Sequence, residues 1–205
     1  MKPEDNVIVP FAGDPAANFR AATSAYIYGL QPGSTSLVAE LAATLHTTLI
    51  NCDPCAHAAA AKAALRGYLC DDKLLSLAQR EGDVRNYRRH LLYADPKSRF
   101  SILAIVWRPG QRTPIHGHTA WGAVGVYEGN PYSEVFDTHS EGRPAMSLDL
   151  LLKRRLQPGD LSTVQPGLDN AHRMGNDSRS RCITIHVYGR DLLARPRSIN
   201  ICFDE

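Results

Sequence analysis

The stretch that decides the fold spans residues 99–127 and reads RFSILAIVWRPGQRTPIHGHTAWGAVGVY. It begins with a continuous run of apolar, β-branched and aromatic residues, Phe100–Trp107, which predicts a buried strand. The Arg-Pro-Gly at 108–110 then marks a turn. A second run, Gly122–Tyr127, predicts another strand, and the triplet His-Gly-His at 116–118 lies between the two. Short strands separated by turns indicate a mainly β fold.

The C-terminal half continues in the same pattern. Gln-Pro-Gly-Asp at 157–160 and Gln-Pro-Gly at 165–167 are turn signals. Further strands are predicted over residues 133–136, 148–156, 161–164, 182–188 and 198–202. Several short strands at this spacing are typical of a sandwich or barrel. We therefore expect residues 96–205 to form a β-barrel.

Residues 1–95 have a different pattern, which predicts mostly helix. Leucine and valine recur at helical spacing in Thr35–His46, at positions 37, 38, 41 and 45. A second helix is expected after Pro54, because proline is accepted in a first turn, and it should continue through the alanine-rich stretch His57–Leu69.

A third helix is predicted to begin at Asp71 or Asp72, either of which could cap it. Its inward residues would be Leu74, Leu75 and Leu77. No flexible linker separates the helices from the strands. We therefore expect helices that pack on the barrel, and one domain that spans residues 1–205.

Composition excludes several classes of function. The chain has 205 residues, of which 43% are hydrophobic and 21% charged, which is ordinary for a globular protein. A formal net charge of +2, without a basic run interleaved with aromatics, argues against a nucleic-acid partner. No segment approaches the roughly 20 apolar residues of a membrane span. With five scattered cysteines and no signal core, we expect a soluble, cytoplasmic protein with no membrane partner.

Three histidines suggest a metal centre. His116 and His118 are two residues apart, so on an extended strand both imidazoles point to the same face. His172 follows 54 residues later, and a barrel can bring it opposite this pair. Three imidazoles with open coordination positions are typical of a catalytic metal site rather than a structural one.

The residues around these histidines resemble the two sequence motifs of the cupin superfamily. Gly110 is followed by five residues and then the His-Gly-His triplet, and later come Gly159, the Pro-Gly at 166–167, His172 and Asn176. Where the usual first motif continues with a metal-binding Glu, this chain has Gly122 and Ala123. The site would then consist of three neutral imidazoles. A metal(II) ion held in this way keeps its full charge, favours an incoming thiolate, and leaves room for O2 beside it.

A second row of polar residues occurs in the predicted strand 182–188. Thr184, His186 and Tyr188 alternate with Ile185 and Val187, so the polar side chains share one face. They could form a hydrogen-bonded row that presents the Tyr188 phenol beside the metal. The alternative interpretation is a strand with one solvent-facing polar side.

At this level of detail the chain resembles the cysteine dioxygenase family of thiol dioxygenases, which are non-haem iron cupins. The resemblance covers roughly residues 85 to 200 and rests on residues 99–118, Trp121-Gly122, Gly125-Val126, 172–176 and 186–189. It implies a jelly-roll-like cupin barrel, with His116, His118 and His172 as ligands of Fe(II). It also implies that Thr184, His186 and Tyr188 stand where the family has a Ser-His-Tyr row.

Two arginines are candidates for binding a substrate carboxylate, for which the planar guanidinium is well suited. Arg89 resembles the substrate-contacting arginine of cysteine dioxygenases. Arg197, nine residues past Tyr188, occupies the place used by the related 3-mercaptopropionate dioxygenases. Because both are present, the sequence leaves open whether the substrate is L-cysteine, 3-mercaptopropionate or another thiol acid.

The expected function is thus oxidation of a small thiol carboxylate to its sulfinate, with the thiol and O2 as partners. Two alternatives remain open. One is a cupin enzyme that holds Zn, Mn or Ni for hydrolysis or isomerisation, and the other is a non-catalytic ligand-binding cupin. The oligomeric state is not determined by the sequence.

Overall fold

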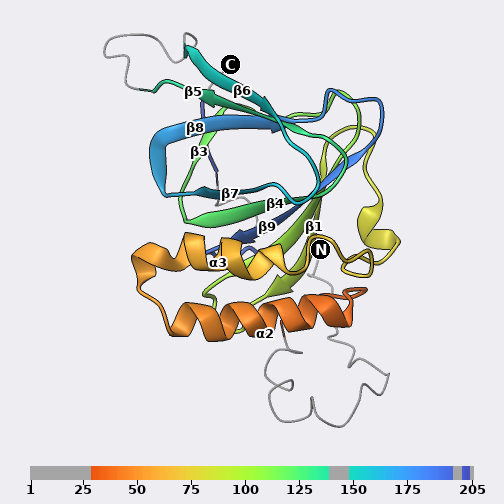
Figure 1. Ribbon diagram of the computed structural model, residues 1–205, viewed down its shortest axis with the longest axis vertical. Helices are drawn as coiled ribbons and strands as arrows, with labels where there is room; N and C mark the ends of the chain where they lie inside the picture. The colour runs from red at the N-terminus through yellow and green to blue at the C-terminus, as the bar shows by residue number, and fades with distance from the viewer. Residues whose placement is uncertain (1–28, 139–147, 196–199, 204–205) are drawn as a thin grey trace, which may run out of the picture.

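The computed structural model describes residues 29–138, 148–195 and 200–203, which form two antiparallel five-stranded sheets that face each other (Figure 1). In the first sheet the strand order is β1 (Arg88–Ala94), β2 (Ser101–Trp107), β9 (Cys182–Tyr188), β4 (Gly122–Glu128) and β7 (Leu161–Val164). In the second it is β10 (Asn200–Cys202), β3 (His116–His118), β8 (Gly167–Gly175), β5 (Tyr132–Phe136) and β6 (Leu150–Arg155). The predicted mainly β, jelly-roll-like fold is confirmed.

The centre of the first sheet is buried on both faces. Every residue of β2 and of β9 is buried, and the two strands pair from Ser101 opposite Tyr188 to Trp107 opposite Cys182. A strand that is covered on both faces consists mostly of apolar residues, which explains the apolar run Phe100–Trp107 in the sequence. Alternate residues of β2 face the helices on one side and the space between the sheets on the other.

Two helices cover the outer face of the first sheet (Figure 1). Helix α2 (Ser36–Ile50) begins after Thr35, whose side-chain oxygen accepts the backbone N–H of Val38. The short 3-10 turn η2 (Pro54–Ala56) leads into α3 (His57–Arg66), which packs on β4 and β7. Leucines of both helices are fully buried in one apolar cluster with residues of β2, β4 and β9. The prediction that the helices pack on the barrel is confirmed.

The prediction of a third helix is wrong. Residues 71–77 form turns, and only a 3-10 turn, η3 (Ala78–Arg80), follows. The side chain of Asp71 accepts the backbone N–H of Lys73, and such a local turn competes with helix formation. Leu74 and Leu75 are buried as expected, but Leu77 is 85% exposed.

Two strands were also missed. β1 lies within the part predicted as mostly helical, and it forms the edge of the first sheet by pairing with β2. β8 lacks an apolar alternation because its sequence, GLDNAHRMG, is largely polar. The predicted strand 148–156 begins two residues later, at Leu150. None of the helices in the described part of the chain is long and apolar enough to cross a membrane.

Candidate metal centre

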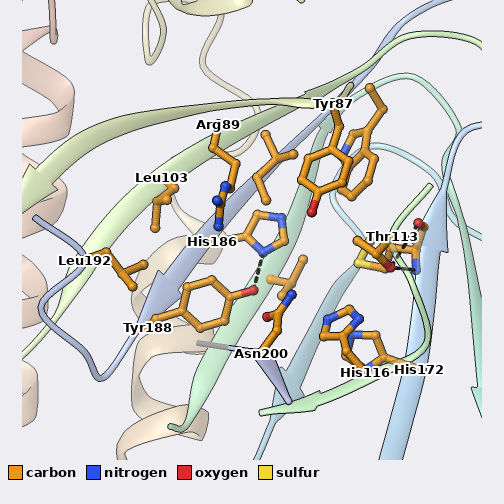
Figure 2. A pocket seen from close by; sticks show the side chains of 14 residues that line it. Tyr87, Arg89, Leu103, Thr113, His116, His172, His186, Tyr188, Leu192 and Asn200 are labelled. Atoms are coloured by element: carbon orange, nitrogen blue, oxygen red, sulfur yellow. Dashed lines mark hydrogen bonds between the residues drawn. The ribbon is translucent and has the colours of Figure 1, made fainter. Parts of the chain in front are cut away.

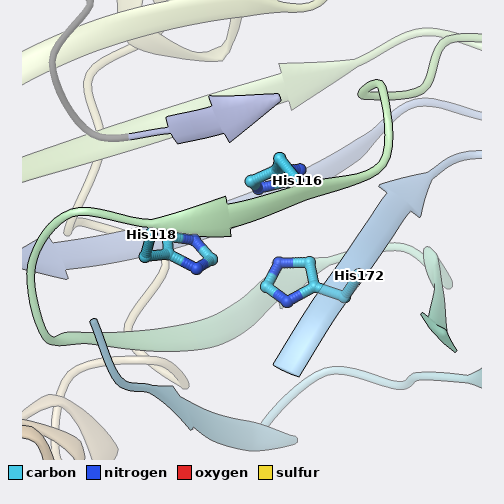
Figure 3. Close-up of side chains that lie close together, drawn as sticks. All are labelled: His116, His118 and His172. Carbon is cyan, nitrogen blue, oxygen red and sulfur yellow. The ribbon is translucent and has the colours of Figure 1, made fainter. Parts of the chain in front are cut away.

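The pairing of β3 with β8 brings the three predicted histidines together (Figure 3). His116 lies opposite His172 in the ladder, and His118 follows on the same face of β3. Each residue offers a ring nitrogen, and these nitrogens all lie within 4.8 Å of one another. The centroids of the three rings are 4.6–5.0 Å apart. The cluster could therefore hold one metal ion.

The chemistry of the rings fits a metal ion. His116 and His118 are almost fully buried, and burial lowers the pKa of both, that of His118 to about 2. Both rings are therefore neutral at pH 7 and keep a lone pair. Nδ1 of His116 lies 3.0 Å from the carbonyl oxygen of Pro114, to which it must donate, so Nε2 is left to bind a metal. Within the described ranges, the buried Nε2 of His118 has no hydrogen-bond partner, as expected for an atom that is meant for a metal.

There is a steric reason for a glycine between His116 and His118. A Cβ atom at Gly117 would collide with the carbonyl oxygen of Gly167 and lie 2.9 Å from Leu168 Cδ2. Gly167 itself has a φ of 120°, which favours glycine. The close approach of β3 to β8, which places His172 beside His116, thus requires the small residue in the His-Gly-His triplet.

The polar row of β9 is present as a chain of hydrogen bonds, which we call the relay, and Figure 2 shows its hydrogen bond between His186 and Tyr188. Oγ1 of Thr184 lies 2.7 Å from Nε2 of His186, and Nδ1 of His186 lies 3.0 Å from the hydroxyl oxygen of Tyr188. All three side chains are buried, so the interpretation of this row as a solvent-facing side is wrong. Burial lowers the pKa of His186 to about 3 and raises the pKa of Tyr188.

The relay and the histidine cluster each contribute two residues to the lining of one pocket. The pocket is lined by His116, His172, His186 and Tyr188, together with Arg89 from β1. In Figure 2 the guanidinium group of Arg89 points towards His186 and Tyr188. The positive charge of Arg89 acts to lower the pKa of both His186 and Tyr188. For Tyr188 the opposite effect of burial is larger, so its pKa is raised. The predicted Arg197 lies outside the described residues.

Several lining residues were not singled out by the sequence. The apolar wall consists of Leu103, Ile105 and Trp107 of β2 and of Leu192. Tyr87 packs against Trp107 with ring centroids 4.8 Å apart, and Asn200 enters from β10. The alternation along β2 could have assigned its three residues to one face, but only the tertiary structure shows that this face meets the relay.

Comparison with known proteins finds distant likenesses only. No family model matches the chain. The fold is similar to a protein with a double-stranded beta-helix domain from Klebsiella pneumoniae subsp. pneumoniae, with 13% identity over 66% of this chain and 100% of that one, and a TM-score of 0.47. It is also similar to a cupin 2 conserved barrel domain protein from Salinispora arenicola, with 20% identity, 55% and 84% coverage and a TM-score of 0.41.

An oxalate decarboxylase from Lactobacillus farciminis, solved as a formate complex, is similar at 15% identity, over 62% of this chain and 35% of that one, with a TM-score of 0.43. These likenesses are distant in both sequence and structure. The chain itself has a mainly β fold of two antiparallel five-stranded sheets, in which three histidines lie close enough to hold a metal ion.

Proposed function

We propose that this protein is a thiol dioxygenase that uses Fe(II) and O2 to convert a small thiol carboxylate, L-cysteine or 3-mercaptopropionate, to its sulfinate. The reaction adds both atoms of one O2 molecule to the sulfur of one thiol. The observation that carries the proposal is that one pocket is lined by two histidines of the cluster, by the phenol at the end of the relay and by Arg89.

Fe(II) is a suitable ion for His116, His118 and His172 because a ferrous ion with three protein ligands has open positions at which a thiol and O2 can meet. Gly122 and Ala123 contribute no ligating side chain at the positions where the cupin motif has its Glu. The cluster therefore adds no negative charge that would repel a thiolate, and a cation bound there would lower the pKa of an incoming thiol.

Arg89 is proposed to bind the substrate carboxylate. A guanidinium group can make two parallel hydrogen bonds to a carboxylate, which fixes the orientation of the substrate as well as its position. The side chain reaches the pocket from β1, while the histidines reach it from the opposite sheet. A small thiol acid could therefore present its sulfur to the cluster and its carboxylate to Arg89.

Tyr188 is proposed to donate a hydrogen bond to the reacting groups. Burial raises the pKa of its phenol, so the proton is retained at neutral pH. The apolar wall of Leu103, Ile105 and Leu192 limits water on this side of the pocket. In such surroundings a hydrogen bond or a charge interaction is stronger than in water.

The proposal is tested by metal analysis together with O2-electrode measurements on the iron-loaded protein with cysteine, 3-mercaptopropionate and cysteamine. We expect stoichiometric iron, O2 uptake that depends on a thiol acid, and one sulfinate formed per O2 consumed. Cysteamine has no carboxylate and serves as the control. Zinc, manganese or nickel without O2 uptake would instead favour a hydrolase or isomerase, and ligand binding by a protein that takes up no metal would favour a non-catalytic cupin.

A further inference from the structure

We propose that Trp107 is a positioning residue that fixes the direction of the hydrogen bonds in the relay, so that the Tyr188 phenol directs its proton into the pocket. The indole Nε1 of Trp107 lies 2.9 Å from Oγ1 of Thr184, the first group of the relay. By distance alone, each of the two following hydrogen bonds could run either way, because hydroxyl groups and a neutral imidazole both donate and accept.

The indole N–H removes this ambiguity because it can only donate. The oxygen of Thr184 therefore accepts a hydrogen bond from Trp107. Thr184 has no exposed surface, and it lies on β9 between β2 and β4, which pair with its backbone. Among the described residues, its hydroxyl forms hydrogen bonds only with the indole N–H of Trp107 and with Nε2 of His186. Nε2 is then the single acceptor for the hydroxyl hydrogen.

In the reverse direction, Nε2 of His186 would carry the proton and donate it to Thr184. The hydroxyl oxygen would accept two hydrogen bonds, and its own hydrogen would be buried without an acceptor, which is unfavourable. In the favoured direction Thr184 donates to Nε2, and the neutral ring carries its proton on Nδ1. Nδ1 then donates to the oxygen of Tyr188, so the phenol hydrogen does not point at His186.

The phenol hydrogen is consequently available to a ligand in the pocket. Arg89, on the same side, carries no acceptor that could take it. The indole is itself held in place, because Trp107 is 1% exposed and its ring packs against that of Tyr87. The direction of the relay depends only on hydrogen bonds of the protein. It therefore stands or falls separately from the proposal that the substrate is a thiol.

The first test is the tautomer of His186 in the wild-type protein. ¹⁵N-histidine labelling of the zinc-loaded, diamagnetic protein would give one ring pattern for each of its eight histidines. The variant His186→Gln identifies the pattern of interest. We expect a neutral ring with the proton on Nδ1 and an accepting Nε2. A proton on Nε2 would overturn the proposal, whatever the activity of the protein.

The second test is Trp107→Phe, which keeps an aromatic ring and removes the N–H. The hydroxyl of Thr184 is then free to rotate, and we expect a His186 signal in which both tautomers contribute. In the iron-loaded enzyme we expect kcat to fall at least about twofold, in proportion to the share of molecules with the proton on Nε2, while the iron content stays unchanged.

Trp121→Phe is the matched control, because it makes the same change at the second tryptophan of the chain, whose indole packs against His57. We expect this variant to leave the His186 tautomer unchanged. A tautomer that is also unchanged in a folded Trp107→Phe protein would show that the indole does not set the direction. If that variant does not fold, the wild-type measurement alone still decides the direction of the relay.

Discussion

The ring of Tyr188 lies directly against Gly122, so that a Cβ atom at Gly122 would be 2.6 Å from Cδ1 and 2.8 Å from Cε1 of the phenol ring. The two residues are partners in the ladder between β4 and β9. This contact explains why the chain has no side chain at a position where the cupin motif can carry a metal-binding Glu. The space that such a side chain would need is filled by the relay tyrosine.

Replacing Gly122 with Ala should therefore displace Tyr188 from His186. We expect turnover to fall by about tenfold or more, since a misplaced proton donor loses much of its contribution. Iron content should remain unchanged because no ligand is touched. Gly67→Ala is the control, because Gly67 has a φ of −69° and its Cβ would meet only the Ala64 oxygen at 3.9 Å. Equal turnover in both variants would argue against a role for the Tyr188 position.

His118→Ala should abolish metal loading. The variant removes the buried Nε2 that has no other partner and leaves two ligands where three are needed. We expect iron content below about a tenth of the wild-type value, in line with the loss of a ligand rather than of a supporting contact. His90→Ala, which changes a histidine of β1 outside the cluster, should load normally. Full iron occupancy in His118→Ala would refute the ligand assignment.

Arg89→Gln should weaken binding of thiol acids selectively. Loss of a hydrogen bond to a charged group costs about 1.5–3 kcal/mol, which corresponds to a rise in KM of roughly 10- to 150-fold. Any residual O2 uptake with cysteamine, which lacks the carboxylate, should be unaffected. Arg88→Gln, at the adjacent position of β1, is the control because Arg88 does not line the pocket.

Arg197→Gln tests the other predicted carboxylate ligand on the same substrates. If Arg89 is the binding residue, Arg197→Gln should leave the KM for thiol acids near the wild-type value. A large increase in KM for 3-mercaptopropionate in Arg197→Gln, with none in Arg89→Gln, would transfer the role to Arg197.

The metal-free protein should lose stability as the pH falls from 6.5. The pKa of His186 is lowered from 6.5 to about 3 in the folded protein, chiefly by burial. Below pH 6.5 the unfolded ring gains a proton while the folded ring stays neutral, so the contribution to stability present at pH 7 is lost as the pH falls. Each such group contributes up to about 1.4 kcal/mol per pH unit to the slope. His116 and His118 act in the same direction.

Urea denaturation at intervals between pH 4.5 and 6.5 measures this slope. His186→Gln should reduce it by about 1 kcal/mol per pH unit, because glutamine does not titrate. Asp95, whose pKa is held below 3.8 by the Arg99 guanidinium and backbone N–H groups in spite of its burial, does not affect the chosen window. An equal slope in the wild-type protein and His186→Gln would contradict the neutral, buried state of this ring.

The amino-acid sequence by itself determined which residues share a face. Along an extended chain, side chains alternate, so the spacing of two places His116 with His118 and Thr184 with His186 and Tyr188, wherever the strands lie. The apolar runs likewise identified β2 and β4, because strands buried on both faces have few polar positions. These conclusions depend only on local geometry, which the sequence carries directly.

The tertiary structure alone decided which faces meet. His172 reaches His116 because β8 pairs with β3, yet β8 has no apolar pattern of its own since much of it faces solvent or the pocket. Arg89 reaches the relay because residues 88–94, within a part predicted as mostly helical, add to the edge of β2. Trp107 meets Thr184 only through the register of β2 with β9. Such contacts join residues far apart in the chain, and the free energy that selects them comes from packing the whole core rather than from local preference.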